Sequence, residues 1–552
     1  MLNKFSSCIT QNIKHAPAQA MLFSLGLTKQ DLNKPQIGIA SMGYAGNPCN
    51  SKLNQYASTI NSSILKQNAI PMLFNTIGIS DGISMGTEGM RYSLPSRELI
   101  ADSIESVVRA HHYDAIICIP GCDKNLPASL LALIQLNRPG AIVYGGSMKS
   151  SPYKQKSLDI ISAFESYGQF TSGKITNKER SLIVENACNK QGGSCAGLYT
   201  ANTMALCLET MGLIIPNGSS TLSTTTAKFD ECKEIGSIIN NLIENDIKPL
   251  DILTKDSFLN AITITYAFGG STNAIIHLLA CAKSANISLN VDDFNSLSFV
   301  PVIANMKPHG KYLMEDLSNI GGTSRVIKYL IEENLINGEC LTITGKSLWD
   351  NVKNIKSLNF NNQKIINPIS DPFKENSHIK ILKGNIAPQG CLSKIYKPIK
   401  VIIGKTLVFD NEHDMIYALN QGKIQKDNII VIRYQGESIG CPEMLLPTSA
   451  LMGYFDNDPP PILTDGRFSG GSNGILVAHL PDAYKKLSIT RIIKDNDKIE
   501  INLINNKINL LISNDQIIDR FLRIPPKCLQ VTGYLKKFSK LCGPFEAGYL
   551  TN

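Results

Sequence analysis

The feature that most constrains the fold of this chain is an apolar run that ends in three potential metal ligands. Residues 114–120 are almost entirely apolar, and Gly-Cys-Asp-Lys-Asn follows at 121–125. A helical stretch at 127–136 and a second apolar run at 141–144 come next. This order of strand, helix and strand predicts a βαβ unit. Ligands of open α/β sheets bind beyond the carboxyl ends of the strands, which is where the cysteine, aspartate and lysine of this pentapeptide would lie.

Two earlier apolar runs extend the pattern into a sheet. Residues 37–41 and 71–77 predict strands, and the loops after them hold Cys49 and Asp81. Parallel strands place their carboxyl ends at one edge, so one sheet could gather all of these side chains. We therefore predict a largely parallel sheet in an N-terminal α/β/α domain, residues 1–369.

The pattern of apolar and polar residues along the chain changes near residue 370. Helical periodicity becomes rare and short β-rich runs replace it. Residues 498–503 alternate with a period of two, turn through two asparagines and return at 507–510, which predicts a β-hairpin. We predict a separate C-terminal β-barrel domain over residues 370–552.

Composition excludes several classes of protein. The 552 residues carry a formal net charge of +8 and a pI near 8.7, but the lysines are scattered and form no basic block, so no nucleic-acid partner is expected. No apolar stretch approaches the roughly 20 residues that cross a bilayer, and the start of the chain has no signal-peptide pattern, so a cytoplasmic location is expected. Fourteen cysteines are too sparse for a disulfide scaffold. The sequence contains no C-x2-C pair, so a zinc ribbon is not expected.

Three cysteines share a context that core cysteines rarely have. Cys49 and Cys122 follow predicted strands beside Pro, Gly or Asn, and Cys195 precedes a periodic helix predicted at 198–211. We interpret Ser194 as the N-cap of that helix, which would place Cys195 in its first turn, where a thiolate is favoured. One reading is packing of three core cysteines. The other is an iron–sulfur cluster with three thiolates and one iron position open to a substrate oxygen.

The oxygen ligands leave similar alternatives open. Asp81, Asp123 and Glu443 are either separate surface carboxylates or a converging set that needs a cation such as Mg²⁺. Lys124 is either an ion-pair partner or a modified side chain. Ser469 lies in Asp-Gly-Arg-Phe-Ser-Gly-Gly. Either this segment is only a tight turn, or its backbone presents the Ser469 hydroxyl to a ligand, with Arg467 as a nearby charge partner.

Long segments of this chain closely resemble the dihydroxy-acid dehydratase family, whose relatives include the 6-phosphogluconate and sugar-acid dehydratases. The matching stretches are SDGISMGTEGMRYSLPSRELIADSIE, PGCDKNLPASLLALIQLNRP, GGSCAGLYTANTMA, FGGSTNAIIHLLA, LKGNIAPQG, PEMLLPTSALMG and LTDGRFSGGSNG. They run from Asp81 to Gly474. One departure is the short segment 434–442, where many relatives carry a longer Gly- and Pro-rich loop, but Pro-Glu443-Met-Leu follows it intact.

The resemblance implies a set of ligands and a fold. It implies a 2Fe–2S cluster on Cys49, Cys122 and Cys195, because family members with a thiol at all three places resemble the 2Fe–2S type. It further implies Mg²⁺ held by Asp81, Asp123, Glu443 and a carbamylated Lys124, with Ser469 as proton acceptor. The implied architecture is an N-terminal α/β domain plus a C-terminal β-barrel in a homodimer.

The reaction implied is the dehydration of 2,3-dihydroxy-3-methylbutanoate and 2,3-dihydroxy-3-methylpentanoate to 2-keto acids, in valine and isoleucine biosynthesis. On this hypothesis the cluster acts as a Lewis acid for the 3-hydroxyl. Mg²⁺ holds the carboxylate and the 2-hydroxyl, and the Ser469 alkoxide takes the C2 proton. The alternatives are a sugar-acid dehydratase of the same family and, from another class, a non-catalytic iron–sulfur regulator that binds nucleic acid.

Overall fold

The computed structural model describes residues 2–153 and 156–551, and its N-terminal half contains a four-stranded parallel sheet. Its strands are β1 (Gln36–Ser41), β2 (Ile70–Asn75), β3 (Ala115–Ile119) and β4 (Gly140–Ile142). Their order in the sheet is β2-β1-β3-β4, and each neighbouring pair is parallel. The crossovers contain α3 (Leu53–Leu65), α5 (Ser93–Ala110) and α6 (Asn125–Leu136). The predicted βαβ unit is confirmed, and β1 and β3 are buried along their whole length because helices cover the sheet.

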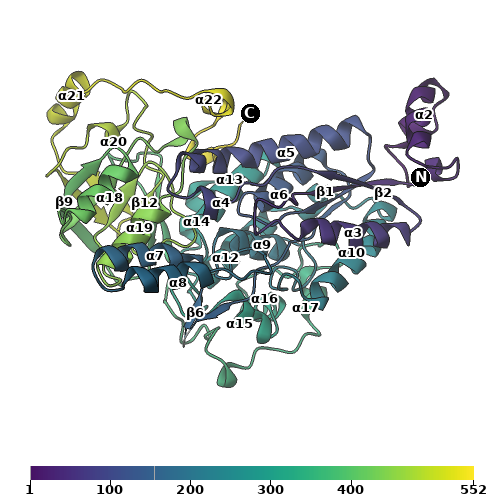
Figure 1. Cartoon of the computed structure of the whole chain (residues 1–552), viewed down its shortest axis with the longest axis horizontal. Coiled ribbons are helices and arrows are strands. Elements are labelled where there is room, and N and C mark those ends of the chain that lie inside the picture. The colour runs from purple at the N-terminus through teal and green to yellow at the C-terminus, as the bar shows by residue number, and fades with distance from the viewer. Residues whose placement is uncertain (1, 154–155, 552) are drawn as a thin grey trace.

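A second layer of helices builds the rest of the N-terminal core. Its central members are α9 (Thr200–Thr210), α12 (Lys255–Phe268) and α13 (Asn273–Ser284). Nearly every residue of these helices is buried, as expected for helices enclosed on all sides rather than lying at a surface. They lie between the parallel sheet and the second half of the chain (Figure 1).

The second half forms an eight-stranded sheet that curls into a barrel. Its strands are β7 (Ile379–Leu382), β8 (Cys391–Ile395), β9 (Val401–Phe409), β10 (Asn428–Ile432), β11 (Ile462–Thr464), β12 (Ile475–Ala478), β13 (Lys498–Asn502) and β14 (Lys507–Leu510). The order is β14-β13-β9-β10-β11-β12-β8-β7, and a bridge between Lys383 and Lys507 links the two edges. The barrel and the hairpin of β13 and β14 are confirmed.

Helices are more common in this half than the sequence reading expected. The longest are α18 (Glu412–Asn420), α19 (Leu445–Tyr454), α21 (Asn514–Arg523) and α22 (Gly533–Leu541). The first two connect the parallel strands β9, β10 and β11, since parallel neighbours need crossover connections. The apolar stretch of α19 has no single polar face because the helix is buried, so it lacks the amphipathic period that marks a surface helix.

The two halves meet where α7 (Ile160–Thr171) packs against α19 (Figure 1). Gly168 and Gly453 allow this approach, because a Cβ on Gly168 would lie 2.2 Å from the carbonyl oxygen of Ala450, and one on Gly453 would lie 2.6 Å from that of Glu165. The end of the chain also returns to the N-terminal half, since η6 (Phe545–Ala547) contacts α13. The cavity described below lies beside the α7–α19 junction.

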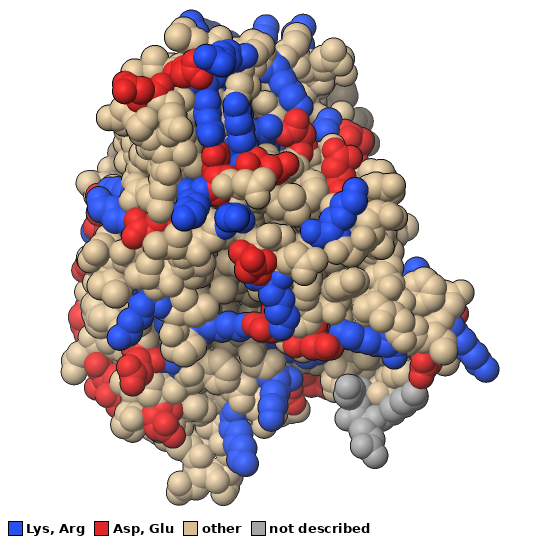
Figure 2. Space-filling model, turned by 90° about the vertical axis from the view of Figure 1, so that its left-hand side faces the viewer, with Lys and Arg blue, Asp and Glu red and all other residues tan. Residues whose placement is uncertain are grey.

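The face of the molecule that Figure 2 displays has no large patch of side chains that all carry the same charge. Lysine and arginine side chains there are interspersed with aspartate and glutamate. Among the described residues, none of the helices is both long enough and apolar enough to span a bilayer.

Candidate metal and catalytic site

The ends of β1, β2 and β3 converge on one cavity of about 230 Å³. Cys49, Asp81, Cys122 and Asp123 follow these strands and line it, as the βαβ topology predicts. The remaining wall residues come from the same strand-end loops, from the segments around Met148, Cys188 and Cys195, from α7 and from the barrel half. They are Pro48, Ser80, Gly82, Ile83, Met85, Met148, Ile160, Ile161, Phe164, Cys188, Cys195, Ala196, Tyr199, Leu445 and Ser469.

The three predicted thiols lie together. The thiol of Cys49 is within hydrogen-bonding reach of the thiols of both Cys122 and Cys195, and these contacts, together with burial, raise the pKa of Cys49 well above its ordinary value. Cys118 and Cys207 are instead buried inside a strand and a helix, as expected of core cysteines. The structure thus separates a clustered set of thiols from those that only fill space.

Two asparagines beside the thiols hold their loops in register. The Asn125 side-chain oxygen accepts hydrogen bonds from the backbone N–H of Cys122 (2.9 Å) and from the Asn50 amide (3.0 Å). A Cβ at position 121 would lie 2.5 Å from the carbonyl oxygen of Cys49, so only glycine permits the approach of the two loops. The sequence Gly-Cys-Asp-Lys-Asn therefore fixes where two of the thiols meet.

The expectation for the backbone around Cys195 is wrong. Helix α9 begins at Thr200, so Ser194 is not its N-cap and Cys195 lies in the loop before it. The Ser194 hydroxyl instead donates to the carbonyl of Gly121, and the Asn202 side chain donates to the carbonyl of Cys195 at 2.7 Å. The loop is fixed by these long-range bonds, which a local capping pattern could not reveal.

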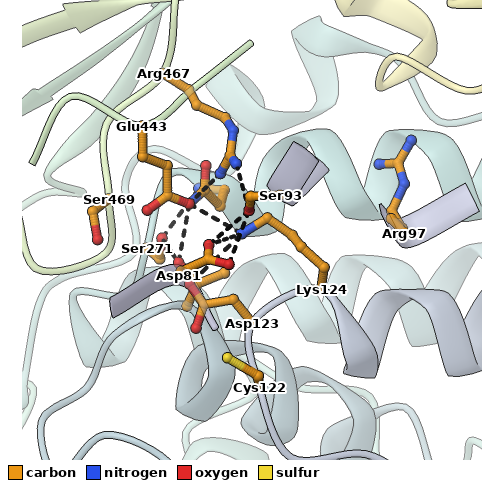
Figure 3. Close-up of polar contacts among 12 residues, drawn as sticks. Asp81, Ser93, Arg97, Cys122, Asp123, Lys124, Ser271, Glu443, Arg467 and Ser469 are labelled. Atoms are coloured by element: carbon orange, nitrogen blue, oxygen red, sulfur yellow. Dashed lines mark hydrogen bonds and ion pairs between the residues drawn. The ribbon is translucent and has the colours of Figure 1, made fainter. Parts of the chain in front are cut away.

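The predicted carboxylates also converge, around the amine of Lys124. Oxygen atoms of Asp81, Asp123 and Glu443 all lie within 4.8 Å of one another, and all three residues are buried. The Lys124 Nζ lies 2.7 Å from Asp81, 3.0 Å from Glu443 and 3.7 Å from Asp123. Figure 3 shows Lys124 reaching between these groups. The amine occupies the place that a cation would take among three carboxylates.

Charge and burial act differently on each of these groups. Burial raises the pKa of Asp123 to about 7. Burial alone would also raise the pKa of Glu443, but the positive charges of Arg467 and Lys124 outweigh burial and lower this pKa to about 2. For Lys124, burial and Arg467 lower the pKa, whereas the three carboxylates raise it more, and the net pKa lies above its ordinary value. The cluster is held together by charge.

Arg467 is bound to the carboxylate cluster. Its guanidinium pairs with the carboxylate of Glu443, and it also donates to the carbonyl of Cys441 at 2.7 Å. Glu443 follows the short 434–442 segment and forms a β-bridge to Arg467. One oxygen of Glu443, Oε2, is buried without a hydrogen-bond partner.

Sequence reasoning missed two polar residues of this site. Ser93 donates to both carboxylate oxygens of Asp81 at 2.9 Å, and Asn273 donates to Oε1 of Glu443 at 2.8 Å. Asn273 lies at the start of α13, after a Gly-Gly-Ser-Thr loop whose composition resembled the other strand-end loops. Ser93 begins α5 and offered no local signal.

Ser469 lies on a tight turn at the cavity wall, only 7% exposed. Its Oγ accepts a hydrogen bond from the backbone N–H of Gly471 at 3.3 Å, and its carbonyl accepts one from Ser472 at 3.0 Å. It also contacts Glu443, which joins it to the carboxylate cluster. The cavity thus brings a hydroxyl, three thiols and a set of carboxylates to the surface of one small space.

Comparison with known proteins identifies the class that this fold and site define. The family model described as dihydroxy-acid/6-phosphogluconate dehydratase N-terminal matches residues 34–351, and the corresponding C-terminal model matches residues 364–549. The chain belongs to the dihydroxy-acid/6-phosphogluconate dehydratase family.

Individual relatives are similar over their whole length. A protein of Francisella tularensis subsp. novicida (strain U112) is 46% identical over 558 residues, covering 100% of this chain and 99% of the relative. One of Schizosaccharomyces pombe, a mitochondrial protein, is 45% identical over 562 residues, covering 100% and 94%. One of Lactococcus lactis subsp. lactis (strain IL1403) is 44% identical over 559 residues, covering 100% and 98%. All three are named dihydroxy-acid dehydratase.

Proposed function

We propose that this protein is a hydro-lyase that removes water from 2,3-dihydroxy-3-methylbutanoate and 2,3-dihydroxy-3-methylpentanoate, giving the 2-keto acids that precede valine and isoleucine. The observation that carries this proposal is that three thiols, two carboxylates and Ser469 line one cavity, with Glu443 beside those two carboxylates. The names of the full-length relatives agree with it.

The donor set fits the two metal groups that the family implies. A thiol at Cys49 within reach of the thiols of Cys122 and Cys195 suits an iron–sulfur cluster with one open position, and we propose a 2Fe–2S cluster on these three cysteines. Buried carboxylate oxygens, one of them without a partner, suit Mg²⁺ held by Asp81, Asp123 and Glu443. When bound, the iron would supply a Lewis acid for the leaving hydroxyl, and Mg²⁺ would supply positive charge toward the substrate carboxylate.

Lys124 needs a chemical change for this arrangement to work. As an ammonium it already neutralises the carboxylates and would repel a divalent cation at the same place. Carbamylation would turn the positive amine into a negative oxygen ligand, so we propose that Lys124 is carbamylated when Mg²⁺ is bound. Arg467 would remain to balance the charge of Glu443.

The chain's own groups then have separate tasks. Ser469 presents its Oγ at the cavity wall and, as the alkoxide, would accept the proton from C2 of the substrate and become a hydroxyl. The bond from the Gly471 N–H fixes that oxygen in place. The enol that forms would then convert to the ketone. A placed base of this kind contributes about 10²–10⁴-fold to a rate.

The remaining wall favours a branched aliphatic substrate over a polyhydroxylated acid. Ile83, Met85, Ile161, Phe164 and Leu445 line the cavity with hydrocarbon. A sugar acid would leave several hydroxyl groups facing these side chains without hydrogen-bond partners, which is unfavourable.

A direct assay tests this choice. The protein, purified anaerobically and supplied with Mg²⁺ and bicarbonate, is given 2,3-dihydroxy-3-methylbutanoate or gluconate in parallel. We expect 2-keto acid from the first at a kcat/KM at least about 10²-fold higher than with the second. Faster turnover of gluconate would instead make the protein a sugar-acid dehydratase. No turnover of either would remove the proposal.

The other expectations stay predictions. We propose a cytoplasmic homodimer that binds no nucleic acid and no membrane, and a division between two domains at residues 369 and 370. The mixed charges in Figure 2 offer no basic stripe for a nucleic-acid-binding regulator on that face.

A further inference from the structure

A buried lysine lies outside the carboxylate cluster. Lys394, on β8, is 1% exposed, and within the described parts of the chain no carboxylate pairs with it. Burial lowers the pKa of this amine to about 7. A buried amine without a carboxylate partner is unfavourable for folding, so its presence at this place calls for a reason.

The position of Lys394 within β8 directs it toward the N-terminal half. Side chains alternate along a strand, and Cys391 and Ile395 of β8 belong to the barrel core, whereas Leu392 belongs to the core of the N-terminal half. Lys394 shares the face of Leu392. There its Nζ donates to two backbone carbonyls, that of Gly470 at 3.2 Å and that of Ser472 at 2.8 Å.

These carbonyls belong to the turn that carries Ser469. In a trans peptide the C=O and the N–H point in opposite directions. The peptide between Gly470 and Gly471 therefore directs its carbonyl toward Lys394 and its N–H toward the Oγ of Ser469, which accepts that N–H at 3.3 Å. One peptide unit links the lysine to the serine oxygen.

The same turn is restrained by its other neighbours. A Cβ at position 470 would lie 2.5 Å from the backbone nitrogen of Thr200, and the Thr448 hydroxyl bonds to that of Ser472 at 3.1 Å. The turn thus fits closely against α9 and α19. Within this setting, Lys394 donates to the carbonyl of the peptide whose N–H faces Ser469.

We propose that Lys394 is a positioning residue for Ser469: by holding the Gly470–Gly471 peptide, it aims the N–H that fixes the Ser469 Oγ toward the substrate. This proposal rests on the proposed function, in which Ser469 accepts the C2 proton. Lys394 does not line the cavity and acts only through the turn.

The test is Lys394→Met in the full-length holoenzyme. Methionine keeps the volume but removes the donor, so the peptide can rotate and the Ser469 Oγ loses its fixed position. We expect kcat to fall about 10–10²-fold, because small displacements of a reacting group have effects of this size. KM should stay within about twofold, because uniform substrate binding is untouched. With C2-deuterated substrate, the kinetic isotope effect on kcat should rise, as proton transfer becomes rate-limiting.

A matched control is available on the neighbouring strand. Lys380 of β7 is half-buried and also donates to a backbone carbonyl, that of Leu503 at 2.9 Å, but it does not contact the Ser469 turn. Lys380→Met should leave kcat and the isotope effect unchanged. Hydrogen–deuterium exchange of the peptide spanning 466–476, measured without substrate, should accelerate in Lys394→Met and not in Lys380→Met.

A double variant separates positioning from general stability. Because Lys394 acts through Ser469, Ser469→Ala with Lys394→Met should be no slower than Ser469→Ala alone. An additive loss, an unchanged kcat in Lys394→Met, or a loss that follows the cluster absorbance would each overturn the inference. If Lys394→Met does not fold, Lys394→Gln undergoes the same measurements with the same criteria, because its amide keeps two N–H donors but on a side chain one bond shorter than that of lysine. Normal turnover by Ser469→Ala would instead overturn the assignment of the base.

Discussion

At the scale of single residues, the site consists of buried polar groups whose burial is unfavourable unless a partner of opposite charge compensates it. The thiol of Cys49 contacts those of Cys122 and Cys195, and three carboxylates are buried beside one another. Burial of such groups is unfavourable, and Lys124 and Arg467 compensate only the carboxylates. An electropositive metal centre is the group that would stabilise the thiolate forms of the three cysteines.

Cys195→Ser tests this interpretation of the thiols. After anaerobic reconstitution with iron and sulfide, we expect the variant to lose the visible charge-transfer absorbance of the wild type while its far-UV circular dichroism stays the same. The loss is expected because serine replaces one of only three thiolates. Cys207→Ser, at a buried helix position away from the cavity, should keep the absorbance. Retained absorbance in Cys195→Ser would assign this thiol to packing.

Much of the residue set could be predicted from the sequence because the relevant side chains follow strands directly. Cys49, Asp81 and Asp123 were found in this way. Ser93 and Asn273 could not be, since their roles depend on partners 12 and 170 residues away along the chain. The prediction for the backbone around Cys195 was wrong for the same reason, because long-range hydrogen bonds fix that loop.

At the scale of elements, α7 is the one that gives the cavity its chemical character. Its N-cap Asp159 accepts from Ser162 at 3.0 Å and from Lys307 at 2.8 Å, which anchors the first turn beside the cavity. Ile160, Ile161 and Phe164 then line the wall. The barrel and its hairpin were predictable from the alternation of apolar and polar residues along the strands. Helix α19 was not predictable, because a buried helix shows no amphipathic period.

Phe164→Gln should change substrate preference at this wall. A polar amide placed among hydrocarbon side chains weakens contact with a branched alkyl group, so we expect kcat/KM for 2,3-dihydroxy-3-methylbutanoate to fall about 10–10²-fold. Steady-state kinetics measure this. Phe170→Gln, on the same helix but 41% exposed, is the control and should alter kcat/KM less than about twofold. Equal effects of the two variants would contradict the role of the α7 wall.

At the scale of the whole molecule, the end of the chain is anchored in the N-terminal half. Arg97 of α5 is fully buried and donates to the carbonyl of Gly548 at 2.9 Å, while it also bonds to Glu98 at 2.7 Å. The Thr551 hydroxyl bonds to the other oxygen of Glu98 at 3.2 Å. Arg97 itself lies apart from the carboxylate cluster (Figure 3).

Arg97→Met should therefore destabilise the protein without direct damage to the site. Removing one partner of a buried ion pair costs about 3–5 kcal/mol, because the other charge stays buried and unpaired. We expect a lower melting temperature by calorimetry. Arg109→Met removes an exposed ion pair on the same helix and should cost less than about 1 kcal/mol. A melting temperature unchanged in Arg97→Met would show that the return of the chain end contributes little.

The order of the proposed ligands along the chain would have a consequence for biogenesis. All three thiols belong to the first half, whereas Leu445 and Ser469, which line the cavity from the barrel half, and Glu443 of the carboxylate cluster come later. Since N-terminal domains fold first during synthesis, a ribosome-bound chain can display the complete thiol set while the opposite wall is still untranslated. Iron and sulfide delivered at that moment would meet an open recess, and the finished enzyme would need no later opening to receive them.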